Sequence, residues 1–124
     1  MKNHYEMKQE KPGSMDTQQM LQLKSIFLAP YMQLSTALIG KARHAGGNMF
    51  RHQIDTLAIL IDYGYIDSVL LKASCVHDTI EDIPDFDSNL IINCDSEGPE
   101  VYKLVLEVTK QKKKKKNDFL RRII

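Results

Sequence analysis

The amino-acid sequence predicts an all-α domain. Apolar residues recur three and four positions apart through most of the chain, which is the spacing of one face of a helix. No segment alternates between apolar and polar residues as a half-buried strand does. A chain of 124 residues is long enough to bury a single hydrophobic core. We therefore expect one small helical bundle.

The N-terminal part predicts a tail followed by two helical segments. Residues 1–14 are polar and include a Pro-Gly pair, so we expect a mobile tail there. Helical spacing begins at Asp16 and continues to Leu28, and Pro30 should end or kink that helix. A second apolar series with helical spacing occupies residues 31–42.

The central part predicts two consecutive helices. Gly46, Gly47 and Asn48 favour a turn and should interrupt the helix. Helix is expected to resume near His52 and to end at Gly64, because glycine suits a C-terminal cap. Asp67 is a good N-cap for the next helix, which should run up to His77.

The C-terminal part predicts a loop, a short segment and a final helix. Residues 82–89 read as a loop in which Pro84 stops the preceding helix, and residues 90–92 are helical or extended. Pro99 suits the first position of a helix. The apolar face of that helix comprises Val101, Leu104, Val105 and Val108. The main domain should therefore cover residues 15–111, and residues 112–124 form a basic tail.

Composition and charge exclude several classes of protein. The net charge is +1, so only the lysine run 112–116 offers weak attraction for phosphate or RNA. The first 20 residues are polar, which excludes a signal peptide, and the apolar run 57–61 is too short to cross a membrane. Cys75 and Cys94 lack C-x-x-C spacing. These features favour a reduced, cytoplasmic protein.

The segment ASCVHDTIED, residues 73–82, places one histidine and three carboxylates behind an apolar run. Moving unpaired charge toward a low-dielectric interior is costly unless something compensates for it, and a metal ion is such a compensator. On a helix, His77 would neighbour Glu81, and Asp78 would neighbour Asp82. The alternative is a solvated helix end that His77 caps, and the spacing alone leaves both interpretations open.

His52 favours the metal interpretation. It begins the helix that precedes the His-Asp segment, and an antiparallel helix pair would bring the start of one helix to the end of the other. His52, His77 and Asp78 would then supply three ligands. Imidazole nitrogen combined with carboxylate oxygen suits Mn, Fe, Co or Zn.

These residues resemble the HD superfamily of metal-dependent phosphohydrolases. More narrowly, they resemble the hydrolase domain of Rel/Spo homologues and their small single-domain relatives, which removes the 3′-pyrophosphate of guanosine tetra- and pentaphosphate. The resemblance covers roughly residues 34–111. It is carried by the turn Gly46–Gly47, Phe50, His52, the string HDTIED at 77–82 and Val-Thr-Lys at 108–110. The superfamily at large shares the His-Asp pair, whereas HDTIED is typical of the narrower group.

The resemblance implies a role for each matching residue. His52, His77 and Asp78 would bind the metal, usually Mn²⁺, and Glu81 and Asp82 would position and activate the attacking water.

Other basic residues and two more histidines are further candidates for contact with the substrate or the metal. Arg43 matches a basic position that the family uses at the nucleotide, and Lys110 is a second candidate for phosphate contact. For Arg43, ordinary solvated charge is an equally good interpretation, as it is for Lys41 and Arg51. His44 reads as a surface histidine in the turn, and His4 as incidental in the tail.

One element of the family pattern is expected to be missing. The family has a further metal-binding Asp on a later helix, in a segment similar to K-L-A-D-R, and its place should fall beyond residue 124. We therefore expect a bundle without the family's C-terminal helices, a weakened metal site, and exposed apolar surface that favours a homo-oligomer. The lysine run 112–116 suggests a slipped reading frame as one hypothesis for the residues after it.

The sequence thus predicts an enzyme of the HD type. Its expected activity is Mn²⁺-dependent hydrolysis of the 3′-pyrophosphate of guanosine tetra- or pentaphosphate, a stringent-response alarmone, and the missing Asp is expected to impair it. One alternative is hydrolysis of another nucleotide. The other is a catalytically silent module that binds a metal or a nucleotide.

Overall fold

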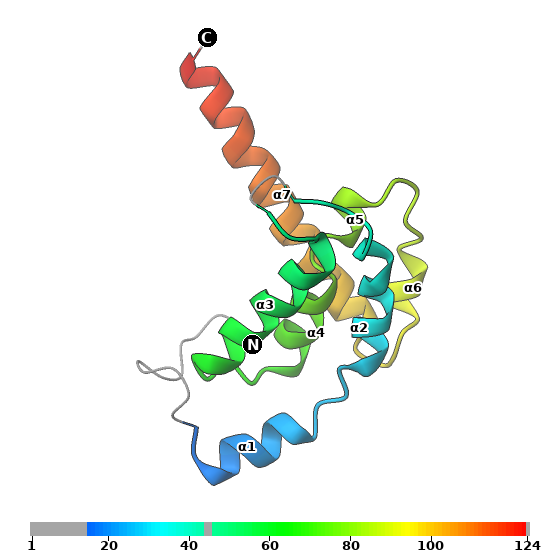
Figure 1. Ribbon diagram of the computed structural model, residues 1–124, viewed down its shortest axis with the longest axis vertical. Helices are drawn as coiled ribbons and strands as arrows, with labels where there is room; N and C mark the ends of the chain where they lie inside the picture. Colours follow the sequence, from blue (N-terminus) through cyan, green and yellow to red (C-terminus); the bar gives the residue numbers. More distant parts are fainter. Residues whose placement is uncertain (1–14, 44–45, 124) are drawn as a thin grey trace.

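The computed structural model describes residues 15–43 and 46–123, with side chains described up to residue 111. The described part is helical apart from turns, loops and one isolated β-bridge, which confirms the all-α prediction (Figure 1). The helices are α1 (Thr17–Lys24), α2 (Ala29–Ser35), the 3₁₀ turn η1 (Thr36–Leu38), α3 (Met49–Asp62), α4 (Ser68–Val76), α5 (Thr79–Asp82), α6 (Asn89–Ile92) and α7 (Gly98–Ile123). The predicted tail 1–14, with His4, and the turn residue His44 lie outside the described residues.

Helix α4 lies at the centre of the fold. It packs against α2, α3 and α7, and every residue from Val69 to Val76 is buried. Its sequence is apolar nearly all round, which is the pattern of a helix covered on every side. Helices α2, α3 and α7 therefore cover α4, whereas α1 lies apart from it (Figure 1).

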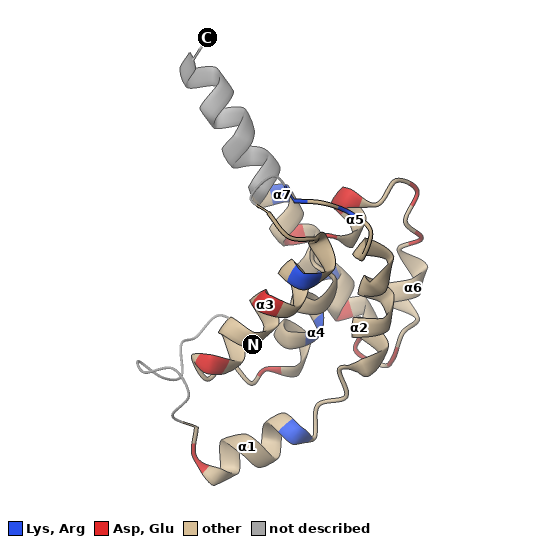
Figure 2. Cartoon of the chain, in the orientation of Figure 1, with Lys and Arg blue, Asp and Glu red and all other residues tan. Residues whose placement is uncertain are grey.

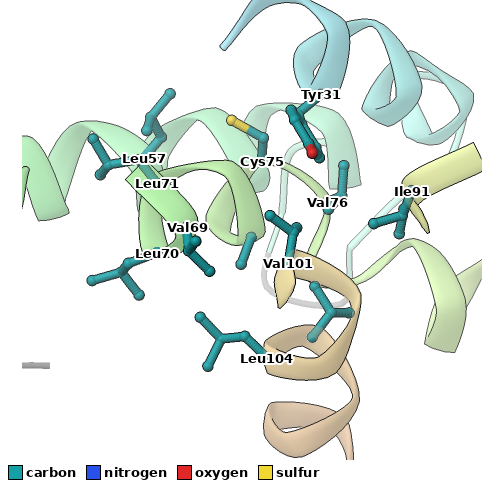
Figure 3. Packing of buried hydrophobic residues seen from close by; sticks show 12 residues of the cluster. Tyr31, Leu57, Val69, Leu70, Leu71, Cys75, Val76, Ile91, Val101 and Leu104 are labelled. Carbon is teal, nitrogen blue, oxygen red and sulfur yellow. The ribbon is translucent and has the colours of Figure 1, made fainter. Parts of the chain in front are cut away.

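The core gathers side chains from α2, α3, α4, α6 and α7 (Figure 3). Several of its members have no exposed surface: Tyr31, Leu71, Cys75, Val76, Ile91, Val101 and Val105. Burial raises the pKa of the Cys75 thiol to about 11, so this cysteine behaves as a small core hydrophobe, as the sequence indicated.

Several helix boundaries differ from the predictions. The first helix ends at Lys24 instead of Leu28, and Pro30 stands in the first turn of α2, where its missing N–H is tolerated. Helix α3 begins at Met49, because the Asn48 side chain accepts a hydrogen bond from the Arg51 N–H. The Asp67 cap is confirmed, since its carboxylate accepts from the Leu70 N–H at 3.0 Å.

The C-terminal elements are helical. Residues 89–92 form the short helix α6, which settles the alternative of helix or extended segment. Helix α7 continues through the lysine run 112–116 to Ile123, so the backbone of most of the predicted basic tail is helical. Among the described residues, no helix combines the length and the apolar character needed to cross a membrane.

A buried ion cluster joins α2, α4 and the loop between α6 and α7. The Lys72 ammonium, 8% exposed, donates to Asp95 at 2.8 Å and to Glu97 at 2.7 Å. The Tyr31 hydroxyl donates to the second Asp95 oxygen at 2.6 Å, and the Ser68 hydroxyl donates to Glu97 at 2.5 Å. One lysine on the central helix therefore satisfies two carboxylates from a loop.

The ionisation of this cluster follows from its hydrogen bonds. Burial alone would lower the pKa of Lys72, but the hydrogen bonds to Asp95 and Glu97 outweigh it and raise that pKa above its usual value. Burial alone would raise the pKa values of Asp95 and Glu97, but the Lys72 hydrogen bonds hold both below their usual values. Burial, followed by the bond to Asp95, raises the pKa of Tyr31.

The first prediction concerns Gly98, where α7 starts against the end of α6. A Cβ atom there would lie 2.2 Å from the Ile92 carbonyl oxygen and 2.5 Å from that of Ile91. Gly98→Ala should lower the free energy of unfolding by about 1–3 kcal/mol, since backbone has to move. Urea denaturation measures this, with Gly40→Ala as control because a Cβ at Gly40 meets nothing within 4 Å. Equal stability of the two variants would contradict the close packing of α6 and α7.

The second prediction concerns the pH dependence of the ion cluster. Because the folded pKa values of Asp95 and Glu97 are depressed, their contribution is present above about pH 4 and is lost as pH falls further. The raised pKa of Lys72 makes its contribution complete below about pH 10 and lost above it.

Lys72→Met tests this assignment. At pH 7 it should cost about 2–4 kcal/mol, below the range for fully buried pairs because both carboxylates reach water. At pH 3 the cost should shrink, since the orphaned carboxylates become protonated. Urea midpoints at the two pH values measure the difference, and a cost independent of pH would refute the assignment.

Candidate metal centre

Three side chains that the sequence singled out meet in space. His52 lies in the first turns of α3, and His77 and Asp78 follow the end of α4. The Nε2 atom of His77 lies 3.1 Å from Asp78 Oδ2, and the Nε2 atom of His52 lies 3.4 Å from the same oxygen. One potential ligand atom from each residue lies within 4.8 Å of the other two. The predicted antiparallel arrangement of the two helices is therefore confirmed at the site.

A tight turn places His52 at the start of α3. Gly46 and Gly47 have φ angles of 98° and 73°, a region that favours glycine. Ala42 and Asn48 form an antiparallel bridge across the turn, and Asn48 then caps α3. The glycine turn predicted from the sequence thus determines where α3 begins, and this sets the position of His52 in its first turn.

The helix that carries the His-Asp pair ends earlier than the HDTIED string suggested. Helix α4 stops at Val76, His77 and Asp78 form a turn, and α5 starts at Thr79. The side chains of His77 and Thr79 bond the carbonyl oxygens of Ser74 and Val76, each at 2.8 Å, which satisfies the end of α4. The four acidic and imidazole groups are therefore not carried on one continuous helix.

The hydrogen bond of His77 also orients its imidazole. Its Nδ1 atom lies 2.8 Å from the Ser74 carbonyl oxygen, which accepts hydrogen bonds and donates none. Nδ1 therefore carries a proton, and Nε2 is the nitrogen that faces Asp78 and His52. A carbonyl partner of this kind fixes the tautomer of histidines that bind metals.

Gln53 belongs to the candidate site, although the sequence did not single it out. Its side chain is completely buried, its amide donates to Asp78 Oδ2 at 2.9 Å, and its carbonyl oxygen accepts from the Asp78 N–H at 3.1 Å. These two bonds clamp Asp78 to α3. The available signal was periodicity, because Gln53 lies four residues before Leu57 on the buried face of α3.

The composition of the group fits a divalent transition metal. Two imidazole nitrogens and one carboxylate oxygen converge, and the three side chains are 27%, 13% and 4% exposed for His52, His77 and Asp78. The two rings meet edge to face with centroids 5.3 Å apart. Mixed nitrogen and oxygen ligands of this kind suit Mn, Fe, Co or Zn better than Mg or Ca.

The predicted catalytic carboxylates lie next to this group. Glu81 and Asp82 are on α5, directly after the His-Asp turn, with Glu81 exposed and Asp82 partly buried. The Lys41 ammonium donates to the Asp82 backbone carbonyl, which ties α5 to the chain that leads into the glycine turn. Neither carboxylate belongs to the three-residue ligand group.

A cavity of about 260 Å³ borders the centre on the side of the glycine turn. It is lined by Arg43, Gly46, Gly47, Asn48, Arg51, His52 and Asp55. His52 belongs both to this cavity and to the ligand group. Arg43 thus lines a cavity that also includes His52, whereas Lys110 lies exposed on α7 and does not line that cavity.

Comparison with known proteins identifies no relative of this chain, so the candidate metal centre is described from its geometry alone. No protein-family model matches the chain. A search of curated proteins likewise finds no match. The convergence of His52, His77 and Asp78, with Gln53 behind them, is thus what characterises this site.

Proposed function

We propose that this protein is a metal-dependent phosphohydrolase of the HD type that cleaves the 3′-pyrophosphate of guanosine tetra- or pentaphosphate. The observation that carries the proposal is the meeting of His52, His77 and Asp78 ligand atoms within 4.8 Å of one another. The HDTIED string, which is similar to that of Rel/Spo hydrolases, supports the choice of substrate. A reduced, cytoplasmic setting belongs to the same proposal.

The residues that would hold the metal are the three of the ligand group. The Nε2 atoms of the two histidines and Oδ2 of Asp78 supply the ligands, and Mn²⁺ is the expected ion. Such an ion polarises a phosphoryl oxygen and lowers the pKa of bound water. Gln53 holds the Asp78 carboxylate in place through its 2.9 Å hydrogen bond.

The side chains around the centre supply the other parts of the reaction. Glu81 or Asp82 accepts the proton of the attacking water, as general base catalysis requires. Water adds to the phosphorus that carries the 3′ oxygen, and the bond from that phosphorus to the 3′ oxygen breaks. The 3′ oxygen takes up a proton, so the products are pyrophosphate and GDP or GTP. The Arg43 guanidinium is suited to hold phosphate through two parallel hydrogen bonds.

A silent metal- or nucleotide-binding module is the second candidate. It is favoured by the small size of the ligand group, which contains three residues among those that the structure describes. Glu81 does not belong to that group, and its side chain is exposed to solvent. Three protein ligands hold a metal with open positions, but binding alone does not require activated water. Hydrolysis of a different nucleotide is a third outcome that the same assay identifies.

Asp78→Asn tests the proposed hydrolysis. With Mn²⁺ and guanosine tetraphosphate, the unmutated protein should release pyrophosphate, and the variant should be at least about a hundredfold slower because it loses an anionic ligand. A pyrophosphate assay and nucleotide chromatography measure the two products. Asp62→Asn, an exposed residue at the end of α3, is the matched control and should keep the activity.

The outcomes of this assay separate the three candidates. Turnover of other nucleotides, but not of guanosine tetraphosphate, would establish the different substrate. Metal binding without any turnover would establish the silent module. Equal activity of Asp78→Asn and the unmutated protein would remove the ligand group from the mechanism.

Gln53→Leu tests the clamp on Asp78. Removing the amide should weaken Mn²⁺ or Co²⁺ binding about 10–100-fold, the usual effect of losing a residue that orients a metal ligand. Isothermal titration with each metal measures the affinity. Gln33→Leu, a substitution at an exposed position of α2, is the control, and unchanged affinity in both variants would show that Gln53 has no such role.

A further inference from the structure

Two arginines share the cavity beside the metal centre. Arg43 and Arg51 both line it, together with the single carboxylate of Asp55. With His52 neutral, this lining carries a formal charge of +1. His52 also belongs to the ligand group, so the cavity and the candidate centre share one side chain.

Arg51 and Asp55 form an ion pair in the cavity, and an anionic ligand can take the place of Asp55 as the partner of Arg51. The Arg51 Nε atom lies 3.8 Å from Asp55 Oδ2, and the side chains are 78% and 63% exposed. Figure 2 shows a basic and an acidic segment one turn apart on α3. Exposed pairs of this type contribute little to stability. A phosphate group, which accepts two parallel hydrogen bonds from a guanidinium, is a stronger partner for Arg51.

The backbone around the cavity is held in place by hydrogen bonds. The Arg43 N–H donates to the Gly47 carbonyl at 3.0 Å, and the Gly46 N–H donates to the Arg43 carbonyl at 3.1 Å. The Arg51 N–H donates to the Asn48 side chain at 2.9 Å. These bonds involve the backbone of Arg43 and Arg51, so changing the Arg51 side chain leaves them intact.

We infer that Arg51 binds a second phosphate group of the substrate, separate from the phosphate at the metal centre. The ligand class is a nucleotide phosphorylated at two positions, of which one reaches the ligand group and the other lies in the cavity. This inference rests on the proposed function, since it assigns another part of the same substrate. Asp55 acts as the competing partner of Arg51 when the cavity holds no anion.

Pyrophosphate binding to the metal-free protein tests this assignment. During a titration with pyrophosphate, the amide NMR chemical shifts of residues 46–51 should change and reach saturation. Arg51→Gln should weaken the affinity about tenfold, because it removes a charged donor. Asp55→Asn should strengthen it about two- to fivefold, because it removes the competing carboxylate. If the substitutions only disturbed folding, Arg51→Gln and Asp55→Asn would both weaken the affinity, and they would not change it in opposite directions.

A charge-matched control separates the cavity from overall attraction. Lys24→Gln removes one exposed positive charge from α1, outside the cavity, and should leave the affinity unchanged. Equal weakening by Lys24→Gln and Arg51→Gln, or no response at residues 46–51, would overturn the assignment. Because this experiment uses neither metal nor turnover, its failure is distinguishable from failure of the proposed hydrolysis.

Discussion

The burial of α4 along nearly its whole length is the constraint on which the rest of the structure depends. Residues Val69 to Val76 are all buried, so the polar groups on this helix need partners inside the protein. Lys72 finds two carboxylates, and the carbonyl oxygens of Ser74 and Val76 are bonded by His77 and Thr79. The ion cluster and the orientation of His77 are both consequences of placing this helix at the centre.

The candidate metal centre uses that constraint. His77 and Asp78 stand at the end of the most buried helix, where the chain has little freedom to move, and Gln53 ties Asp78 to α3. Histidine and carboxylate ligands oriented by buried hydrogen bonds are already arranged before an ion binds, which reduces the cost of assembling the site.

The two sides of the centre differ in their exposure to water. The side chains of His77 and Asp78 are largely desolvated, with 13% and 4% of their surface exposed. The cavity on the other side of His52 is lined by exposed Arg51 and Asp55, whose mutual attraction is screened. The buried ligand group and the open cavity with two arginines are the two features on which the proposed substrate, which carries phosphate groups, rests.

The sequence by itself determined the helical class, the glycine turn and the Asp67 cap, because these follow from spacing and from residues a few positions apart. It singled out His52, His77 and Asp78 as candidate ligands only by assuming that two helices pair and by a resemblance to a family. It did not reveal the break after Val76, the buried role of Gln53 or the cavity shared by Arg43 and Arg51. Those features depend on contacts across the fold, such as the bond between Gln53 and Asp78 that spans 25 residues. Only the packing of α3 against α4 decides such contacts, since no local pattern specifies which buried polar groups will meet.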